Sequence, residues 1–228
     1  MPYCKVCGHE TEYWGEIPFY KNNEHIKFVS REDYVLDYFI CPNCNFLATY
    51  NFDALTQHDF SSIIYNDEYI KVDPEFPEIR PMRVASWFKS KFPDTSLSIL
   101  DYGAGSSKFG QILAEHGYCI ESWDPMWGDV PLPLKQFDLI TCFEVFEHAQ
   151  NPIKTIEEIA QMLKPTGKLL FSTQVTDSVR PLTVDWWYFT PRGGHISHHS
   201  FRSLMLLCKK VGLKLNSYDA GMHEATFE

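Results

Sequence analysis

Two short stretches of this 228-residue sequence gather side chains that exchange protons near neutral pH. The first reads EVFEH and the second reads HISHHS. Carboxylates and imidazoles act as general acids and bases, and they also ligate divalent cations. Since the first stretch follows a predicted strand and the second precedes a predicted helix, we expect both at the carboxyl edge of one sheet. The predicted catalytic residues are His195, His198, His148 and Glu144.

Each of these side chains taken alone has an equally good structural interpretation. Glu147 and His148 could cap or brace the helix that follows them, and His198 or His199 could simply face solvent. A lone histidine is weak evidence of chemistry. The convergence of two clusters on one edge is what favours a functional role for at least one histidine.

Four of the seven cysteines form two Cys-x-x-Cys pairs, CKVC and CPNC. Each pair lets two thiolates reach one metal from a tight turn, and two pairs complete a tetrahedral sulfur site. The sequence therefore predicts a structural zinc site, with a redox pair as the alternative. Its ligands would be Cys4, Cys7, Cys41 and Cys44. The other cysteines lie in apolar contexts and are expected in the core: Cys119, Cys142 and Cys208.

The stretch ILDYGAGSSKFG has the outline of a nucleotide-binding loop. Gly103 and Gly105 fit a dinucleotide motif, but Lys108 stands where that motif has its third glycine. Asp101 would repel a pyrophosphate and suits a ligand with a cationic amino group. Asp124 ends the next predicted strand and is well placed to accept hydrogen bonds from two ribose hydroxyls.

Strand and helix patterns alternate through the second part of the chain. The predicted strands are 97–102, 118–124, 137–143, 168–173 and 213–218. The predicted helices cover 79–91, the segment ending at Gly117, a segment opening at Pro152, and a segment from the cap Ser200 to Gly212. This alternation predicts an α/β fold with a doubly wound, mostly parallel sheet.

We expect three regions along the chain. Residues 1–60 carry aromatics and short strand-like runs such as HIKFVS, and are predicted to form a small zinc-binding module. Residues 61–78 contain Pro74 and Pro77 and are predicted to be a connector. Residues 79–228 are predicted to be the main α/β domain.

Charge and hydropathy exclude several classes of protein. The formal net charge of −10 argues against binding to a nucleic-acid backbone or to anionic lipid. No apolar run approaches the roughly 20 residues of a membrane span, and the N-terminal residues do not resemble a signal peptide. We expect a cytoplasmic protein without nucleic-acid or membrane partners, whose oligomeric state the sequence leaves open.

Four segments in order resemble the class I S-adenosylmethionine-dependent methyltransferases, which have a Rossmann-like fold. They are DYGAG, SWDP, FDLITCFEVFEH and LKPTGKLLFST, and the resemblance covers roughly residues 79–220. It implies that S-adenosylmethionine is the cofactor, that the glycines approach its methionine and ribose, and that the two aspartates hold its amino end and ribose. The implied cofactor-binding residues are Asp101, Gly103, Gly105, Asp124, Cys142 and Phe143.

A cysteine module ahead of such a domain, together with WWYFTPRGGHISHHS, resembles bacterial methyltransferases associated with sugars and polysaccharides. The resemblance implies a small polar acceptor such as a nucleotide sugar or saccharide. Only PMWGDVPLPLKQ separates Asp124 from the next strand, which is too short for the usual helix and third strand. Asp129 is then the remaining candidate for contact with adenine. The C-terminal antiparallel strand pair is also expected to be abbreviated, and a non-catalytic binder or adaptor is the alternative function.

The string EVFEH also resembles the metal-dependent quinol O-methyltransferases and the small-RNA 2′-O-methyltransferases. That resemblance implies a second, divalent-cation site with magnesium as the candidate ion, which would lower the pKa of an acceptor hydroxyl. Its ligands would be Glu144, Glu147, His148 and His195. The alternative is a metal-free site in which the motif caps a helix and His195 or His198 acts as the general base.

Overall fold

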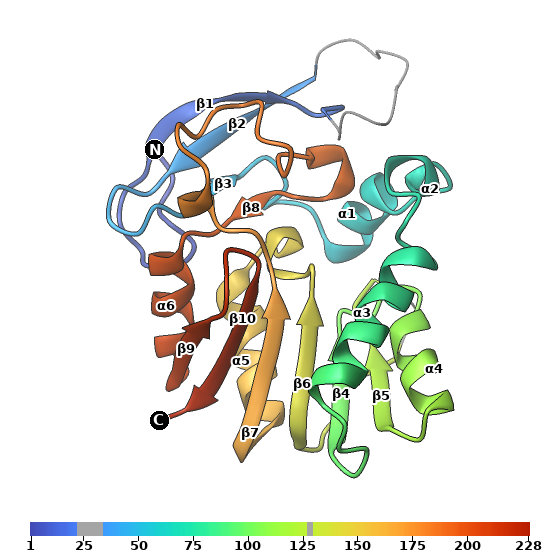
Figure 1. Ribbon diagram of the computed structural model, residues 1–228. Coiled ribbons are helices and arrows are strands. Elements are labelled where there is room, and N and C mark those ends of the chain that lie inside the picture. The colour runs from blue at the N-terminus through green and yellow to red at the C-terminus, as the bar shows by residue number, and fades with distance from the viewer. Residues whose placement is uncertain (22–33, 127–129) are drawn as a thin grey trace.

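The computed structural model describes residues 1–21, 34–126 and 130–228, and these form two sheets. The predicted strand HIKFVS and Asp129 lie outside the described residues. The smaller sheet has the strand order β1-β2-β3-β8, and the larger has the order β5-β4-β6-β7-β10-β9 (Figure 1). The small sheet lies across the carboxyl ends of the parallel strands of the large one (Figure 1).

Parallel strands make up most of the large sheet. They are β5 (Cys119–Trp123), β4 (Ser98–Tyr102), β6 (Phe137–Phe143) and β7 (Leu163–Ser172). The near-continuous apolar character of β6 is what a strand covered on both faces requires. The predicted α/β class with a mostly parallel sheet is confirmed.

Two C-terminal strands complete the large sheet. β10 (Met222–Phe227) runs antiparallel between β7 and β9 (Leu213–Ser217), pairing with both. The expected abbreviation of this pair is therefore wrong, because the last residues of the chain form a six-residue strand. At the other edge, the described residues between β5 and β6 form no strand, as the short segment predicted.

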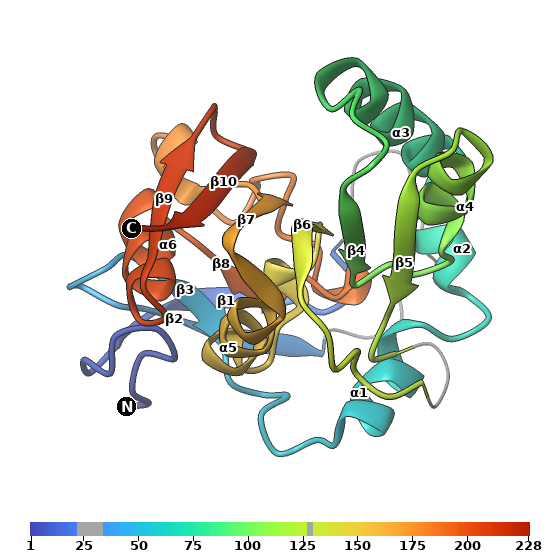
Figure 2. The ribbon, with the colours of Figure 1, turned by 90° about the horizontal axis from the view of Figure 1, so that it is seen from below.

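Helices cover both faces of the large sheet (Figure 2). On one face, α3 (Ile79–Lys91) and α4 (Lys108–Glu115) bury Phe88 and Leu113 in one apolar cluster with strand residues. On the other face lie α5 (Pro152–Met162) and α6 (Phe201–Lys209). They contribute Ile156, Ile159, Leu204 and Leu207 to a second apolar cluster.

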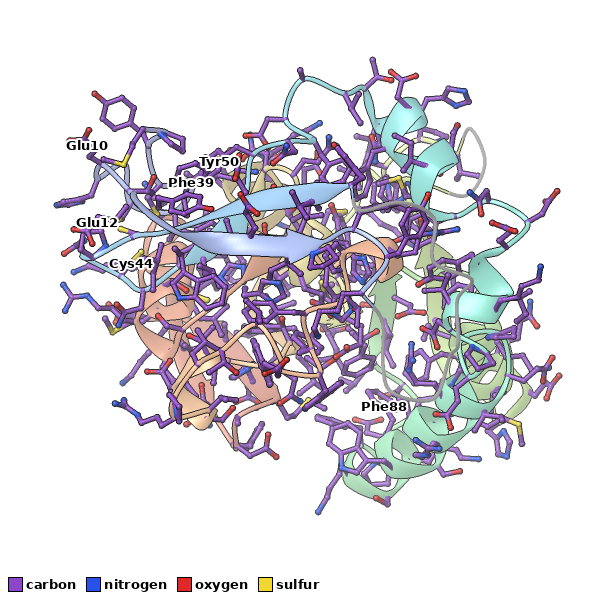
Figure 3. The ribbon with its side chains drawn as sticks, turned by 90° about the horizontal axis from the view of Figure 1, so that it is seen from above. Glu10, Glu12, Phe39, Cys44, Tyr50 and Phe88 are labelled. Carbon is purple, nitrogen blue, oxygen red and sulfur yellow. The ribbon has the colours of Figure 1, made fainter. Side chains whose placement is uncertain are left out.

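The small sheet recruits a strand from far along the chain. β1 (Glu12–Pro18), β2 (Val35–Ile40) and β3 (Leu47–Thr49) pair in sequence, and β8 (Ser197–His198) then pairs with β3. Phe39 and Tyr50 lie together beside this sheet, far from Phe88 of α3 (Figure 3). The small sheet thus includes a strand from outside residues 1–60, and the predicted domain boundaries stay a prediction.

The predicted connector contains helical structure. α1 (Gln57–Ile64) is opened by a capping box between Thr56 and Asp59, and α2 (Tyr69–Val72) follows. Both helices bury apolar side chains in an aromatic cluster under the small sheet, whose members include Tyr38, Phe60, Tyr69, Trp186, Tyr188 and Phe189. In the part of the chain that is described, the helices lack the length and apolar character needed to cross a membrane.

Candidate active site

A cleft of about 1430 Å³ opens at the carboxyl ends of β4, β5 and β6. One wall comes from the loops that follow these strands, and the other from α1, α2, the start of α3 and the segment before β8. Clefts at this edge of a parallel sheet are where α/β proteins bind ligands. The predicted site residues that line it are Asp101, Gly103, Gly105, Asp124, Phe143, Glu144, His148 and His195.

Two positions in the loop after β4 accommodate glycine alone. Gly103 and Gly105 have φ of +76° and +51°. A Cβ on Gly103 would lie 2.4 Å from a methyl of Val145, and one on Gly105 would lie 2.7 Å from the Phe76 ring. The loop therefore presents bare backbone to the cleft, which lets a ligand approach closely.

Asp101 lies at the floor of this loop. Its carboxyl is buried and accepts a hydrogen bond from the Thr141 hydroxyl at 3.0 Å. Burial raises the pKa of Asp101 to about 7. Its charge can therefore change near neutral pH.

Asp124 follows β5 and ties the strand end to the glycine loop. One carboxylate oxygen accepts from the Gly105 N–H and the other from the Met126 N–H, each at 2.7 Å. This geometry holds Asp124 at the cleft wall.

Phe143 and Cys142 do not share the environment predicted for them. Phe143 lines the cleft, whereas Cys142 is fully buried in the apolar cluster beneath α5. Successive side chains of a strand point to opposite faces, so neighbours on β6 cannot both face the ligand. The prediction that Cys142 flanks the cofactor is wrong, and burial raises the pKa of its thiol well above the usual value.

Glu144 directly follows β6 and has a conformation that is uncommon outside glycine, with φ of +54°. Ser172 of β7 holds it there: the Glu144 N–H donates to the Ser172 hydroxyl at 3.0 Å, and that hydroxyl donates to the Glu144 carboxylate at 2.8 Å. Strained backbone that the surroundings enforce is concentrated at functional sites. The turn carries the chain directly into the short 3₁₀ helix Phe146–His148.

Glu147, His148 and His195 meet at one point. Each offers a ligand atom, and these atoms lie within 4.8 Å of one another. The His148 Nδ1 lies 3.2 Å from the Tyr65 hydroxyl, and the His195 Nδ1 lies 3.0 Å from the Tyr188 carbonyl oxygen. These contacts leave the Nε2 of each ring for a ligand. Among the described residues, the buried Oε2 of Glu147 has no hydrogen-bond partner.

The surroundings disfavour charge on all three groups. Burial raises the pKa of Glu147 well above its usual value, and the Glu144 carboxylate adds to the effect. Burial lowers the pKa of His148 well below its usual value and also lowers that of His195. Neutral imidazoles and an unpartnered carboxylate oxygen fit a divalent cation. Two nitrogens and a carboxylate suit manganese, iron, cobalt or zinc better than magnesium, which prefers oxygen ligands.

His198 is not part of this site. Its side chain is fully buried among aromatic rings, with the Phe189 ring centroid 4.5 Å from its own. Neither ring nitrogen has a hydrogen-bond partner within the described chain, and burial lowers the pKa of His198 well below its usual value. The prediction of a catalytic His198 is wrong, because β8 directs this side chain into the core under the small sheet. His199 is buried as well, and burial lowers its pKa to about 3.

The aromatic run WWYF contributes side chains to both the core and the cleft. Trp186, Tyr188 and Phe189 are buried, whereas Trp187 is 51% exposed and lines the cleft. The Tyr188 hydroxyl nevertheless reaches the site, where it donates to Glu147 at 2.5 Å. Sequence reasoning missed the roles of Tyr188 and Tyr65, since an aromatic side chain in such a run carries no pattern that distinguishes core packing from a polar contact.

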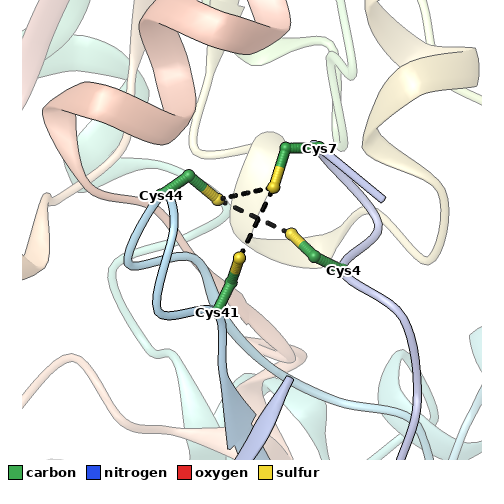
Figure 4. A group of neighbouring side chains, drawn as sticks. All are labelled: Cys4, Cys7, Cys41 and Cys44. Atoms are coloured by element: carbon green, nitrogen blue, oxygen red, sulfur yellow. Dashed lines mark hydrogen bonds between the residues drawn. The ribbon is translucent and has the colours of Figure 1, made fainter. Parts of the chain in front are cut away.

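The four paired cysteines come together as predicted (Figure 4). The Sγ–Sγ distances are 3.6 Å for Cys4 and Cys44, 3.4 Å for Cys7 and Cys41, and 3.5 Å for Cys7 and Cys44. The hydrogen bond with Cys44 lowers the pKa of the Cys4 thiol to about 5. Four sulfurs at these separations fit the corners of one tetrahedral site.

Comparison with known proteins shows the family to which this chain belongs. A family model described as a methyltransferase domain matches residues 73–218. The ubiquinone biosynthesis O-methyltransferase of Pseudomonas entomophila (strain L48) is 26% identical over 123 aligned positions, which cover 42% of this chain and 52% of that protein. The chain thus spans about half the length of the curated relatives it matches.

Solved structures share the fold. The human N-acetylserotonin methyltransferase in complex with S-adenosylmethionine has a TM-score of 0.53 at 14% identity, covering 77% of this chain and 61% of that one. A mitomycin 7-O-methyltransferase has a TM-score of 0.55 at 15% identity, covering 74% and 60% of the two chains. At this identity the similarity concerns the arrangement of the large sheet and its helices.

Proposed function

Since the chain belongs to the methyltransferase domain family, we propose that it transfers the methyl group of S-adenosylmethionine to a hydroxyl of a small acceptor. One observation carries the proposal. The glycine loop, with Asp101 and Asp124, opens onto the same cleft as His148 and His195. A methyl donor held at the first set of residues would present its reactive carbon toward the second set.

In this proposal the strand ends of β4, β5 and β6 hold the cofactor. The Asp101 carboxylate attracts the amino group, and the bare backbone at Gly103 and Gly105 admits the methionine and ribose. Asp124 accepts hydrogen bonds from the ribose hydroxyls. Phe143 packs against the ligand from the end of β6.

The acceptor would bind beside Glu144, His148 and His195. A divalent cation held by Glu147, His148 and His195, with Glu144 adjacent, would stabilise the deprotonated acceptor hydroxyl. The donor set favours manganese over the predicted magnesium. As the acceptor oxygen bonds to the methyl carbon, the carbon–sulfur bond breaks, and the hydroxyl proton passes to water.

The charges of the cleft favour an uncharged acceptor. Among the described lining residues, six carry carboxyl groups and three carry permanent positive charges. The guanidinium of one of the three, Arg80, is already paired with Asp73 through two hydrogen bonds of 2.8 Å. A nucleotide diphosphate would be repelled here. The exposed indole of Trp187 offers a flat surface, so a saccharide or phenol with a free hydroxyl is the proposed substrate class, ahead of a nucleotide sugar.

The cysteine site is proposed to hold a structural zinc ion through Cys4, Cys7, Cys41 and Cys44. All four ligands are thiols, which is the set that closed structural zinc sites use. The ion would hold the turn that precedes β1 against the turn that follows β2, at one end of the small sheet.

The decisive experiment couples binding to turnover. Calorimetry with S-adenosylmethionine is followed by methyl transfer to phenols, uncharged glycosides and nucleotide sugars, read by mass spectrometry. Methyl transfer should occur with the uncharged acceptors and should be lost after chelation. Added manganese should restore a higher turnover than added magnesium. Cofactor binding without transfer to any acceptor would indicate a non-catalytic binder. Full turnover after chelation, combined with its loss in His195→Ala, would leave His195 as the base and remove the metal.

A further inference from the structure

Tyr188 contacts three of the four residues of the proposed cation site. Its hydroxyl lies 2.5 Å from Oε1 of Glu147 and 3.2 Å from Oε2 of Glu144. Its main-chain carbonyl oxygen lies 3.0 Å from Nδ1 of His195. We infer that Tyr188 is a positioning residue that sets the Glu147 carboxylate and the His195 imidazole for a divalent cation. This inference rests on the cation of the proposed function.

The Tyr188 hydroxyl gives the two oxygens of the Glu147 carboxylate different roles. A phenol has one proton to donate, and the shorter distance assigns it to Oε1 of Glu147. The second oxygen of Glu147, Oε2, is buried and has no hydrogen-bond partner in the described part of the chain. A carboxylate with one oxygen held and the other bare presents a single defined ligand atom. Outer contacts of this kind orient metal-binding carboxylates.

The carbonyl selects the tautomer of His195. Because a carbonyl oxygen only accepts hydrogen bonds, Nδ1 must carry the ring proton, and Nε2 keeps its lone pair. The two rings also pack edge to face, with centroids 4.3 Å apart. Histidines that bind metals are oriented in this way by a carbonyl or carboxylate behind them.

Tyr188 is itself held rigidly. Its side chain is 1% exposed and belongs to the aromatic cluster beneath the small sheet. The ring centroid of Trp186 lies 5.4 Å from that of Tyr188. A side chain packed in this way keeps its position, and the three groups that it contacts are therefore held against a fixed partner.

The substitution Tyr188→Phe isolates the hydroxyl, because the ring and the carbonyl remain. The matched control is Tyr218→Phe, which removes an exposed phenol bonded to Glu224 at 3.0 Å, outside the cleft lining. Manganese affinity is measured by electron paramagnetic resonance of the free ion. S-adenosylmethionine affinity and melting temperature are measured on the same samples. We expect Tyr188→Phe to weaken manganese binding at least tenfold and to lower kcat, with cofactor affinity unchanged and the control like wild type.

The outcomes separate this inference from the proposed function. Equal manganese affinity in wild type and Tyr188→Phe would overturn the inference alone. A Tyr188→Phe protein that loses cofactor binding or melts far earlier would assign the hydroxyl to the fold and overturn it as well. Wild-type protein that binds no manganese would overturn the cation of the proposed function and, with it, the role given to Tyr188.

Discussion

The hydroxyl of Ser200 donates a hydrogen bond to the main-chain carbonyl of Cys44 across 156 positions of sequence. The same two regions also meet in the small sheet, where the Thr49 N–H donates to the Ile196 carbonyl at 3.0 Å. Ile196 in turn donates to the carbonyl of Glu147 at 2.9 Å. The cysteine turns and the cleft residues are therefore linked by main-chain hydrogen bonds, and a disturbance at the cysteines should reach His195.

Replacing one ligand of the cysteine site tests this linkage. In Cys41→Ser we expect zinc to be lost and β3 to loosen, because a structural zinc site contributes directly to folding free energy. Hydrogen exchange should then accelerate at residues 195–199, while β4 keeps its protection. Cys119→Ser, at an exposed cysteine of the large sheet, is the matched control. Unchanged protection at 195–199 in a zinc-free Cys41→Ser protein would show that the cysteine site does not stabilise residues 195–199.

Asp124→Ala should weaken S-adenosylmethionine binding at least about tenfold, a loss of roughly 1.4 kcal/mol. The variant removes the proposed ribose contact and also the acceptor of the Gly105 N–H. Calorimetry measures the change. Asp219→Ala is the control, since its carboxylate also accepts from two backbone amides but lies in the β9–β10 turn. Wild-type affinity in Asp124→Ala would remove this residue from the cofactor site.

The pKa of Asp101 makes cofactor binding depend on pH. Burial raises this pKa to about 7, so the carboxyl gains a proton as the pH falls through neutrality. The neutral form no longer attracts an ammonium group, and affinity should therefore fall as pH is lowered. One titrating group with this pKa predicts about an eightfold loss between pH 7.5 and pH 6. Calorimetry at several pH values measures it, and Asp101→Asn should bind weakly with little pH dependence. A wild-type affinity that rises toward pH 6 would contradict the assignment.

Local patterns were sufficient to predict most of the large domain. The helix predicted at 79–91 is α3, and the strand predicted at 137–143 is β6, because apolar periodicity and turn residues lie within each segment. The two-residue strand β8 could not be found in this way, since its pairing with β3 depends on residues about 150 positions away. Because local patterns do not reveal the pairing of β8 with β3, the sequence predicts His198 in the cleft.

The residues of the candidate site likewise fall into a group that local sequence predicts and a group that it does not. Asp101, Gly103, Gly105 and Asp124 reach the cleft because a strand end and its loop position them. The contacts of Tyr188 and the left-handed backbone of Glu144 depend instead on tertiary packing, which leaves no local mark in the sequence.

Gly194 is expected to be essential to the position of His148. It has φ of +94°, and a Cβ there would lie 2.5 Å from Nδ1 of His148. Gly194→Ala should therefore lower stability by about 1–3 kcal/mol and weaken manganese binding. Gly117→Ala is the control, because Gly117 has φ of +85° with nothing within 4 Å of the added Cβ. Thermal denaturation and metal titration of both variants separate backbone strain from displacement of His148. Equal manganese affinity in the two variants would show that His148 tolerates the intrusion.

Two of the three histidines of the HISHHS stretch, His195 and His198, should respond differently to the same substitution. His195→Phe removes a group that lines the cleft, so turnover should fall at least about 100-fold, as expected for loss of a catalytic acid–base or ligand group. His198→Phe places an aromatic ring where Tyr38, Trp186, Tyr188 and Phe189 already surround an imidazole. Replacing a buried polar group that makes no hydrogen bond by an apolar ring of similar shape is nearly neutral or stabilising.

We therefore expect His198→Phe to keep its turnover and to unfold at the same urea concentration as wild type or at a higher one. Urea denaturation followed by fluorescence, together with the methyl-transfer assay, measures both properties on each variant. A His198→Phe protein that is stable but inactive would return His198 to the chemistry. Such a result would mean that the aromatic enclosure opens during turnover, since the ring makes no contact with the cleft in its present position.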